Sequence, residues 1–296
     1  MNTKSAFVTI VGRPNVGKSS LLNAFVGEKV AIVSPKPQTT RMRITGVLTK
    51  DETQLVFIDT PGMHRPRTKL GEHMVKQINS SVTDVDVAIL MTEAAGEIRT
   101  SEINLMESLK AKKIPAVLAV NKIDTLKQKE LMMDKILKLS ELFKFDEIVP
   151  LSVLKRDGVD ILLGIIEKYA KPAPHFFDGD AYTDQTERVI ISEIVREKVL
   201  MNMRDEIPHG TAVEIEAMRE RESGGIIDIR AVIYCEKQSH KSMVIGKNGE
   251  TLKKIGSQAR AEAEKLLGLK VNLQCWVKVK QDWRNSAQNL RRLGFQ

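Results

Sequence analysis

The sequence contains few features of a secreted, membrane-spanning or metal-binding protein. Its two cysteines, Cys235 and Cys275, lie in separate strand-like apolar stretches without the spacing of a metal site, so we expect buried, reduced thiols in a cytosolic protein. No apolar run approaches the roughly 20 residues of a membrane-spanning helix. The short apolar run near the start leads directly into a glycine loop, which predicts a first strand rather than a signal peptide. There is also no long-period repeat and no low-complexity tract.

The remaining composition is that of a soluble globular protein. Of the 296 residues, 42% are apolar and 28% are charged, and this length suits about two domains. The formal net charge of +8 is unevenly distributed, because residues 237–296 hold 13 basic and 4 acidic side chains while residues 171–236 hold 8 and 14. A charge run usually forms a solvated face, but a local excess of this size indicates a polyanionic partner for the C-terminal segment.

Two different element patterns divide the chain. Residues 6–170 alternate apolar strand segments with helical segments, which predicts an α/β fold with a doubly wound, mostly parallel sheet and ligand sites beyond the carboxyl ends of its strands. A stretch rich in Pro, Gly and Asp then predicts a linker. The order after it is helix, two strands, two helices, a strand and a final basic helix, which predicts an α+β domain. We place the domains at 4–171 and 187–296, with the linker at 172–186.

The segment GRPNVGKS at residues 12–19 lies between an apolar strand and a helix pattern. Its glycines, Gly12 and Gly17, allow backbone N–H groups to surround phosphate oxygens, and the helix N-terminus adds partial positive charge. Lys18 would reach the β- and γ-phosphates of a nucleotide, and the Ser19 hydroxyl would bind Mg²⁺. On its own, the segment could also be a glycine-rich turn without a ligand.

The motif DTPG at residues 59–62 also ends a strand pattern. Asp59 can hold Mg²⁺ through water, and the N–H of Gly62 can meet a γ-phosphate. Such a tetrapeptide alone is often an ordinary turn. Its position after the second sheet strand favours the nucleotide interpretation.

The motif NKID at residues 121–124 predicts recognition of guanine. The carboxylate of Asp124 can accept both hydrogen-bond donors of the guanine edge, whereas adenine offers the opposite polarity there. Asn121 can tie the base to the loop, and Lys122 can cover it. In the next loop, LSVLKRDGV, Ser152 and backbone amides would lie near guanine O6.

A second glycine loop, VIGKNG, lies at residues 244–249, where the basic excess begins. It lacks the GK[ST] ending of a triphosphate loop but matches a G-x-x-G loop that clamps about four nucleotides of single-stranded nucleic acid. Most such tetrapeptides are simply turns between helices. The residues predicted to contact RNA are Ile245, Gly246, Lys247, Asn248, Gly249, Lys253 and Lys254, with Arg260 near the path. Trp283 could stack on a base or pack inside the domain.

Together these segments resemble the Era group of bacterial ribosome-assembly GTPases, within the TrmE-Era-EngA-like GTPases, in nearly the whole chain. The resemblance depends on GRPNVGKSSLLN, PQTTR, DTPGMH, NKID, EIPHGTAVEIE and VIGKNGETLKKIG, and it implies a C-terminal type-2 KH domain. It also implies that Thr40 of PQTTR binds Mg²⁺ and the γ-phosphate, with Thr39 as the alternative. Ser20 stands where threonine is more usual, and SVLK replaces the common SAL.

The residues that we predict to bind GTP combine these motifs: Gly12, Arg13, Pro14, Asn15, Val16, Gly17, Lys18, Ser19, Ser20, Asp59, Thr60, Pro61, Gly62, Met63, Asn121, Lys122, Ile123, Asp124, Ser152 and Val153. Ser19, Thr40 and Asp59 are the predicted Mg²⁺ ligands. The resemblance further implies GTP and GDP as ligands, binding to the 3′ end of 16S rRNA in the small ribosomal subunit (30S) during its assembly, a cytoplasmic monomer, and peripheral contact with the cell membrane, for which we find no anchoring sequence.

The predicted catalytic residues are Lys18, Thr40 and Asn15. Many GTPases orient the attacking water with a Gln directly after the DxxG glycine, but Met63 stands there and cannot do so, which favours a packing role for its side chain. Either another group positions the water, or intrinsic turnover is slow. In some GTPases that this chain resembles, an Asn at the position of Asn15 helps to hold K⁺ against the phosphates. We therefore expect K⁺ to accelerate hydrolysis relative to Na⁺.

The predicted mechanism is a switch in which GTP and Mg²⁺ order the segments around Thr40 and residues 59–63. Residues 63–73, which are polar and basic, could then restack against the RNA-binding domain. One alternative is an RNA-binding module with a structural, slowly hydrolysed nucleotide. Another is a metabolic P-loop kinase, but guanine recognition has no clear use there.

Overall fold

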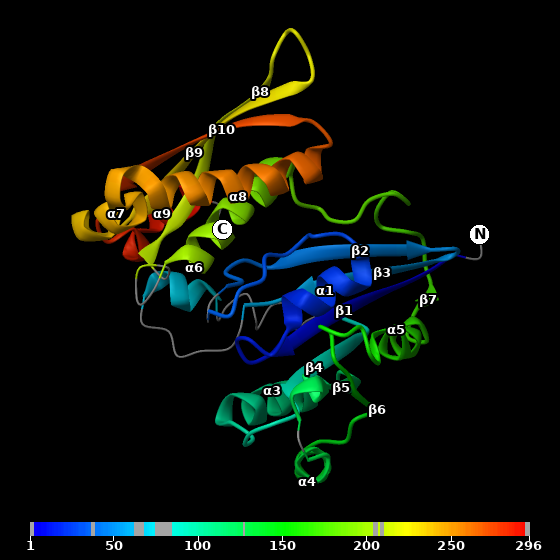
Figure 1. The fold of residues 1–296 in the computed structure, drawn as a ribbon. Coiled ribbons are helices and arrows are strands. Elements are labelled where there is room, and N and C mark those ends of the chain that lie inside the picture. The colour runs from blue at the N-terminus through cyan, green and yellow to red at the C-terminus, as the bar shows by residue number, and fades with distance from the viewer. Residues whose placement is uncertain are drawn as a thin grey trace. The chain divides into compact units, whose positions relative to one another are not determined.

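The structure is a computed structural model, and its elements are drawn in Figure 1. By their contacts, Met1–Ala31, Thr40–Arg65 and Met74–Asp184 form one unit, whereas Ile32–Thr39, Pro66–His73 and Gln185–Gln296 form a second. The residues that the structure describes are 3–36, 39–61, 68–74, 85–126, 128–203, 207 and 210–293.

The first unit contains a sheet whose strands follow the spatial order β2-β3-β1-β4-β5-β6. β2 runs antiparallel to β3, and the other neighbours in this order are parallel. The predicted doubly wound, mostly parallel sheet is confirmed. Its strands are β1 (Lys4–Gly12), β2 (Ile44–Lys50), β3 (Thr53–Asp59), β4 (Val87–Glu93), β5 (Ala116–Asn121) and β6 (Glu147–Pro150).

Helices cover both faces of this sheet, which explains the continuous apolar runs of its strands. In β4, Ile89 belongs to the core under α1 (Lys18–Val26) and α5 (Val159–Glu167). The next residue, Leu90, belongs to the core under α3 (Thr100–Ala111) and α4 (Glu130–Leu142). Successive side chains of a strand point to opposite faces, so a strand buried on both sides is apolar throughout.

The parallel register brings the carboxyl ends of four strands to one edge of the sheet. Ile10 pairs with Asp59, Gly12 pairs with Met91, and Glu93 pairs with Asn121. The phosphate loop, DTPG and NKID therefore emerge side by side, as expected for a ligand site in an open α/β sheet.

The segment predicted as a linker lies along the first unit. β7 (Lys171–Pro172) pairs antiparallel with β1. Farther along, the side chain of Gln54 accepts the backbone N–H groups of Phe176 and Phe177, and the N–H of Val47 donates to the carbonyl of Tyr182. These contacts fix the segment until the second unit begins at Gln185.

The main elements of the second unit follow the order predicted for a type-2 KH domain: α6 (Glu187–Asn202), β8 (Ala212–Glu220), β9 (Ile226–Cys235), α7 (Gln238–Ile245), α8 (Glu250–Leu267) and β10 (Lys270–Val279). β9 is antiparallel to β8 and parallel to β10. In Figure 1, α6 and α8 lie against one face of this sheet, and a core that includes Ile191, Ile229 and Ile255 fills the space between them.

Trp283 and the two cysteines differ in how deeply they are buried in the C-terminal domain. Trp283 is fully buried and its indole N–H donates to the carbonyl of Gly210 at 3.0 Å, so the packing alternative for this residue is confirmed. Cys235 is buried as expected, but Cys275 is only partly so. Burial raises the pKa of each thiol to about 11.

Within the described residues, no helix has the length and apolarity to cross a bilayer.

Candidate nucleotide site and RNA groove

The phosphate loop has a backbone that only glycine can supply at two positions. Gly12 has φ +154° and Gly17 has φ +107°, in a region that side chains with a Cβ rarely adopt. A Cβ on Gly17 would lie 2.3 Å from Nδ2 of Asn121, and one on Gly12 would lie 2.5 Å from the carbonyl oxygen of Met91. The loop is thus packed tightly against the strand ends.

Lys18 is the charged group at the centre of this loop. Its ammonium donates to the carbonyl oxygens of Gly12 at 3.1 Å and Arg13 at 2.9 Å. Burial lowers its pKa, and the nearby Asp59 carboxylate opposes that shift. A buried ammonium at a helix N-terminus, surrounded by loop backbone, fits a polyanionic phosphate chain.

Three oxygen-bearing side chains meet where Mg²⁺ is expected. The Ser19 hydroxyl donates to Oδ2 of Asp59 at 2.6 Å and lies 2.8 Å from Oγ1 of Thr40, which is 3.4 Å from the same carboxylate oxygen. Burial raises the pKa of Asp59, and Lys18 opposes the shift. In the described part of the chain, Oδ1 of Asp59 is buried without a hydrogen-bond partner. Such a set of hard oxygen donors fits Mg²⁺.

The structure distinguishes the two candidate switch threonines. Thr40 lies at the oxygen cluster, whereas the hydroxyl of Thr39 lies 2.7 Å from that of Ser34 and donates to the carbonyl of Lys36 at 2.6 Å. The Thr60 hydroxyl donates to the carbonyl of Ile10, and Pro61 follows it. The predicted Gly62 and Met63 lie outside the described residues.

The guanine motif joins three loops through one amide. Nδ2 of Asn121 donates to the carbonyl of Val16 at 2.8 Å, and its Oδ1 accepts the N–H of Val153 at 3.0 Å. The exposed carboxylate of Asp124 accepts the Ser152 hydroxyl at 2.6 Å. Ser152 therefore orients the predicted base-reading carboxylate.

The other predicted nucleotide residues lie around these groups. Val16 is buried, Asn15 is exposed at the loop tip with φ 64°, and Lys122 has φ 67°. Pro14, Ser20 and Ile123 are partly buried in the phosphate loop, the first turn of α1 and the base loop. Arg13 makes ion pairs with two acidic residues, Glu93 and Glu102, that no motif had indicated.

The rear glycine loop has the same dependence on glycine. Gly246 and Gly249 have φ +75° and +79°, and a Cβ on Gly246 would lie 2.2 Å from the Thr251 hydroxyl oxygen. Between them, Lys247 and Asn248 are exposed. The loop therefore presents backbone and two polar side chains directly before α8.

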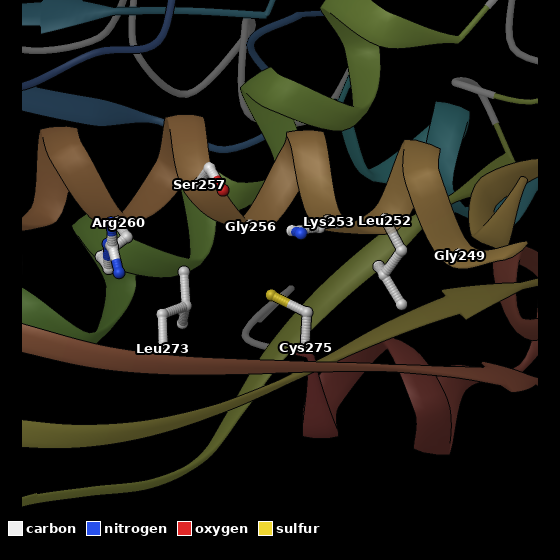
Figure 2. Close-up of a pocket in the computed structure, with 8 residues that line it drawn as sticks. All are labelled: Gly249, Leu252, Lys253, Gly256, Ser257, Arg260, Leu273 and Cys275. Atoms are coloured by element: carbon white, nitrogen blue, oxygen red, sulfur yellow. The ribbon is translucent and has the colours of Figure 1, made fainter.

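A groove of about 350 Å³ begins at this loop, as Figure 2 shows. α8 contributes Leu252 and Lys253 along one wall, and β10 contributes Leu273 and Cys275 opposite them. Its full lining is Gly249, Leu252, Lys253, Gly256, Ser257, Arg260, Leu273 and Cys275. An apolar floor flanked by cations fits a single strand with unstacked bases.

Some predicted RNA residues lie beside this groove rather than in it. Ile245 packs against the domain core, and Lys254 is exposed on α8 without lining the groove. The side of the groove opposite α8 comes from Leu273 and Cys275, neither of which was predicted to contact RNA. Their alternate positions in β10 place both side chains on one face of the strand, and this spacing was the available signal.

The segment that precedes Thr40 belongs to the second unit. The N–H of Val33 donates to Oε1 of the buried Glu197 at 2.8 Å. The guanidinium of Arg196 donates to the carbonyl of Thr39, and the ammonium of Lys36 to the carbonyl of Met203. Residues 32–39 are thus held by the C-terminal part of α6, a contact that the sequence did not predict. In the predicted segment 63–73, the N–H of Lys69 donates to Oδ1 of Asn285 at 3.2 Å, and residues 63–67 lie outside the described residues.

Comparison with known proteins gives the same two parts. The family model described as 50S ribosome-binding GTPase matches residues 7–122, and that of the KH domain matches residues 206–284. GTPase Era of Ruminiclostridium cellulolyticum is 50% identical over 295 residues, which cover 100% of this chain and 98% of that protein. GTPase Era of Clostridioides difficile is 50% identical over 292 residues, with coverages of 99% and 98%.

Two solved structures match with a TM-score of 0.95 and 37% identity over 99% of each chain: a variant of Aquifex aeolicus Era bound to GDP·AlF4⁻, and Era in complex with MgGDPNP and nucleotides 1506–1542 of 16S ribosomal RNA. Fold, sites and matches together define a P-loop GTPase that carries a C-terminal KH domain. The chain belongs to the Era family of GTPases.

Proposed function

We propose that this GTPase is a molecular switch that binds single-stranded RNA at the 3′ end of 16S rRNA through its KH domain and acts in assembly of the small ribosomal subunit. A relative of 37% identity binds nucleotides 1506–1542 of 16S rRNA together with MgGDPNP. The groove beside the GxxG loop has the basic and apolar lining that such a ligand needs. The 30S role extends what is known of the family to this chain.

One observation carries the switch proposal: Thr40 lies at the Mg²⁺ oxygens, and the residue before it is held by Arg196 of α6. Ser19, Thr40 and Asp59 would hold Mg²⁺, whose charge would offset that of the GTP phosphates and fix Thr40 in this position. Any movement of Thr40 alters the strain on residues 32–39 and hence on α6. GTP and RNA then favour one arrangement, and each raises the affinity of the other by the same factor.

The hydrolytic roles follow from the same residues. Lys18 would neutralise charge on the GTP phosphates, and Thr40 would supply one oxygen to Mg²⁺. We propose that Asn15, exposed at the tip of the phosphate loop, helps to hold K⁺ where an arginine finger would otherwise act. Replacing Na⁺ by K⁺ should accelerate GTP hydrolysis, and Asn15→Ala should abolish that preference. Equal rates in both salts would reject the role of K⁺ without affecting the switch.

The alternative is an RNA-binding module whose nucleotide is structural and slowly hydrolysed. Single-turnover cleavage of bound GTP, with and without an oligonucleotide of the 16S rRNA 3′ end, separates the two. A switch requires the RNA to change the cleavage rate or GTP affinity, whereas a module leaves both unchanged. Crosslinking of that RNA with GTP present should map to residues 245–254.

We propose a cytoplasmic monomer, with peripheral membrane contact as a family expectation for fractionation to test.

A further inference from the structure

Glu93, the last residue of β4, lies between two nucleotide loops without belonging to either motif. Its Oε2 is 3.6 Å from Nη2 of Arg13 in the phosphate loop, and its Oε1 forms an ion pair with the ammonium of Lys122 in the guanine loop. The side chain of Glu93 is 30% exposed, so the pairs are only partly screened by water. One carboxylate therefore joins the loop for phosphates to the loop for the base.

Further contacts hold Glu93 and Arg13 in place. The ammonium of the buried Lys135, on α4, donates to the backbone carbonyl of Glu93 at 2.7 Å. On the other side, the buried carboxylate of Glu102 lies 3.3 Å from Nε of Arg13 and accepts the Thr92 hydroxyl at 2.6 Å. Neither Glu93 nor Arg13 is thus a freely moving surface side chain.

In the guanine loop, Lys122 has an unfavourable backbone conformation that nearby contacts must hold. Lys122 has φ 67°, a left-handed conformation that is unfavourable for a residue with a Cβ. Its neighbour Asn121 is fixed by its own carbonyl, which accepts the N–H of Ala94 at 2.7 Å. The ion pair with Glu93 holds the side chain of Lys122, two residues before the predicted base-reading carboxylate of Asp124.

We propose that Glu93 is a positioning residue that couples the phosphate loop to the guanine loop. Binding of the base fixes Lys122, which fixes Glu93 and through it Arg13, so each half of the nucleotide pre-orders the loop that receives the other half. Glu93 acts through these two cations and not on the reacting atoms. Its effect falls on nucleotide affinity and lifetime, while cleavage of bound GTP proceeds at its ordinary rate.

The test is Glu93→Gln, which keeps the shape of the side chain but cannot hold two cations. The GDP dissociation rate and the KM for GTP should each rise roughly five- to tenfold, in keeping with a partly exposed ion pair, while kcat changes by less than about twofold. Glu97→Gln removes the same charge from an exposed site nearby and is the matched control. A dissociation rate equal to that control, or a lower kcat with unchanged KM, would overturn the proposal.

A double variant separates coupling from a general loss of stability. If Glu93 acts through Arg13, combining Arg13→Gln with Glu93→Gln should accelerate GDP release no more than the stronger single change. Additive effects would contradict the network. Glu93→Asp keeps the charge but is too short to reach both cations, so it should give an intermediate rate. If Glu93→Gln fails to fold, Glu93→Asp serves as the test variant in its place.

Discussion

Glu197 of α6 accepts a hydrogen bond from the backbone N–H of Val33 at 2.8 Å. The same carboxylate pairs with Lys198, which also contacts Glu262 of α8. Residues 32–39 are therefore linked through α6 to the helix that lines the RNA groove. In the switch that we propose, this chain of contacts would be the physical route by which nucleotide and RNA influence one another's binding.

The two neighbouring threonines provide a direct test of the metal site. Thr40→Ala removes an oxygen from the group formed with Ser19 and Asp59 and should weaken Mg²⁺-dependent GTP binding by about 10- to 100-fold. Thr39→Ala removes a hydroxyl that contacts only Ser34 and Lys36 in the hydrogen bonds described, so its effect should be small. Mg²⁺ titrations monitored by a fluorescent GTP analogue distinguish them, and equal effects would show that the oxygen cluster is not the metal site.

Asp124 should determine the choice of base. Asp124→Asn replaces an acceptor with a group that also donates, so it should lower GTP affinity and raise affinity for xanthosine triphosphate, whose edge has an oxygen in place of the amino group. Competition binding with both nucleotides measures the change. Ser152→Ala, which removes the hydroxyl that orients Asp124, should weaken GTP binding without this reversal. If Asp124→Asn still preferred GTP over xanthosine triphosphate, the role of Asp124 in base recognition would be contradicted.

The GxxG loop can be tested with a pair of glycines. Both Gly246 and Gly249 have positive φ, so alanine at either costs about 1–2 kcal/mol in backbone conformation. Only at Gly246 would the new Cβ collide with Thr251, whereas at Gly249 nothing lies within 4 Å. Gly246→Ala should therefore weaken binding of a 16S 3′-end oligonucleotide about tenfold more than Gly249→Ala. Fluorescence anisotropy gives both affinities, and similar losses would show that the close approach at Gly246 is unimportant.

The sequence was most informative where function depends on local backbone. Gly12, Gly17 and Gly246 were recognisable because each must adopt a conformation or a close approach that other residues resist. Continuous apolar runs likewise indicated strands covered on both faces. Contacts between distant segments were not readable in this way, since Glu93 looks like any acidic residue at a strand end and Glu197 like any surface position of a helix. Their partners become evident only when the fold brings residues 13, 122 and 33 to them.

The same limit applies to the choice of switch segment. The polar, basic composition of residues 63–73 predicted a contact with the RNA-binding domain, but nothing in the sequence indicated residues 32–39, because composition does not reveal which backbone groups a helix will contact. Arg196 and Glu197, both only 2% exposed, are buried charges that need partners. Among the described residues, the N–H of Val33 donates to the carboxylate of Glu197, and the carbonyl of Thr39 accepts from the guanidinium of Arg196.

The central claim is that nucleotide state controls RNA affinity through residues 32–39 and α6. The most direct measurement is RNA affinity for a 16S 3′-end oligonucleotide with a non-hydrolysable GTP analogue and with GDP, in the wild type, in Arg196→Ala and in the exposed control Arg188→Ala. We predict an analogue-to-GDP affinity ratio of about 5 to 150 in the wild type, unchanged in Arg188→Ala and close to one in Arg196→Ala. A wild-type ratio of one, or an Arg196→Ala ratio equal to the wild type, would contradict the account.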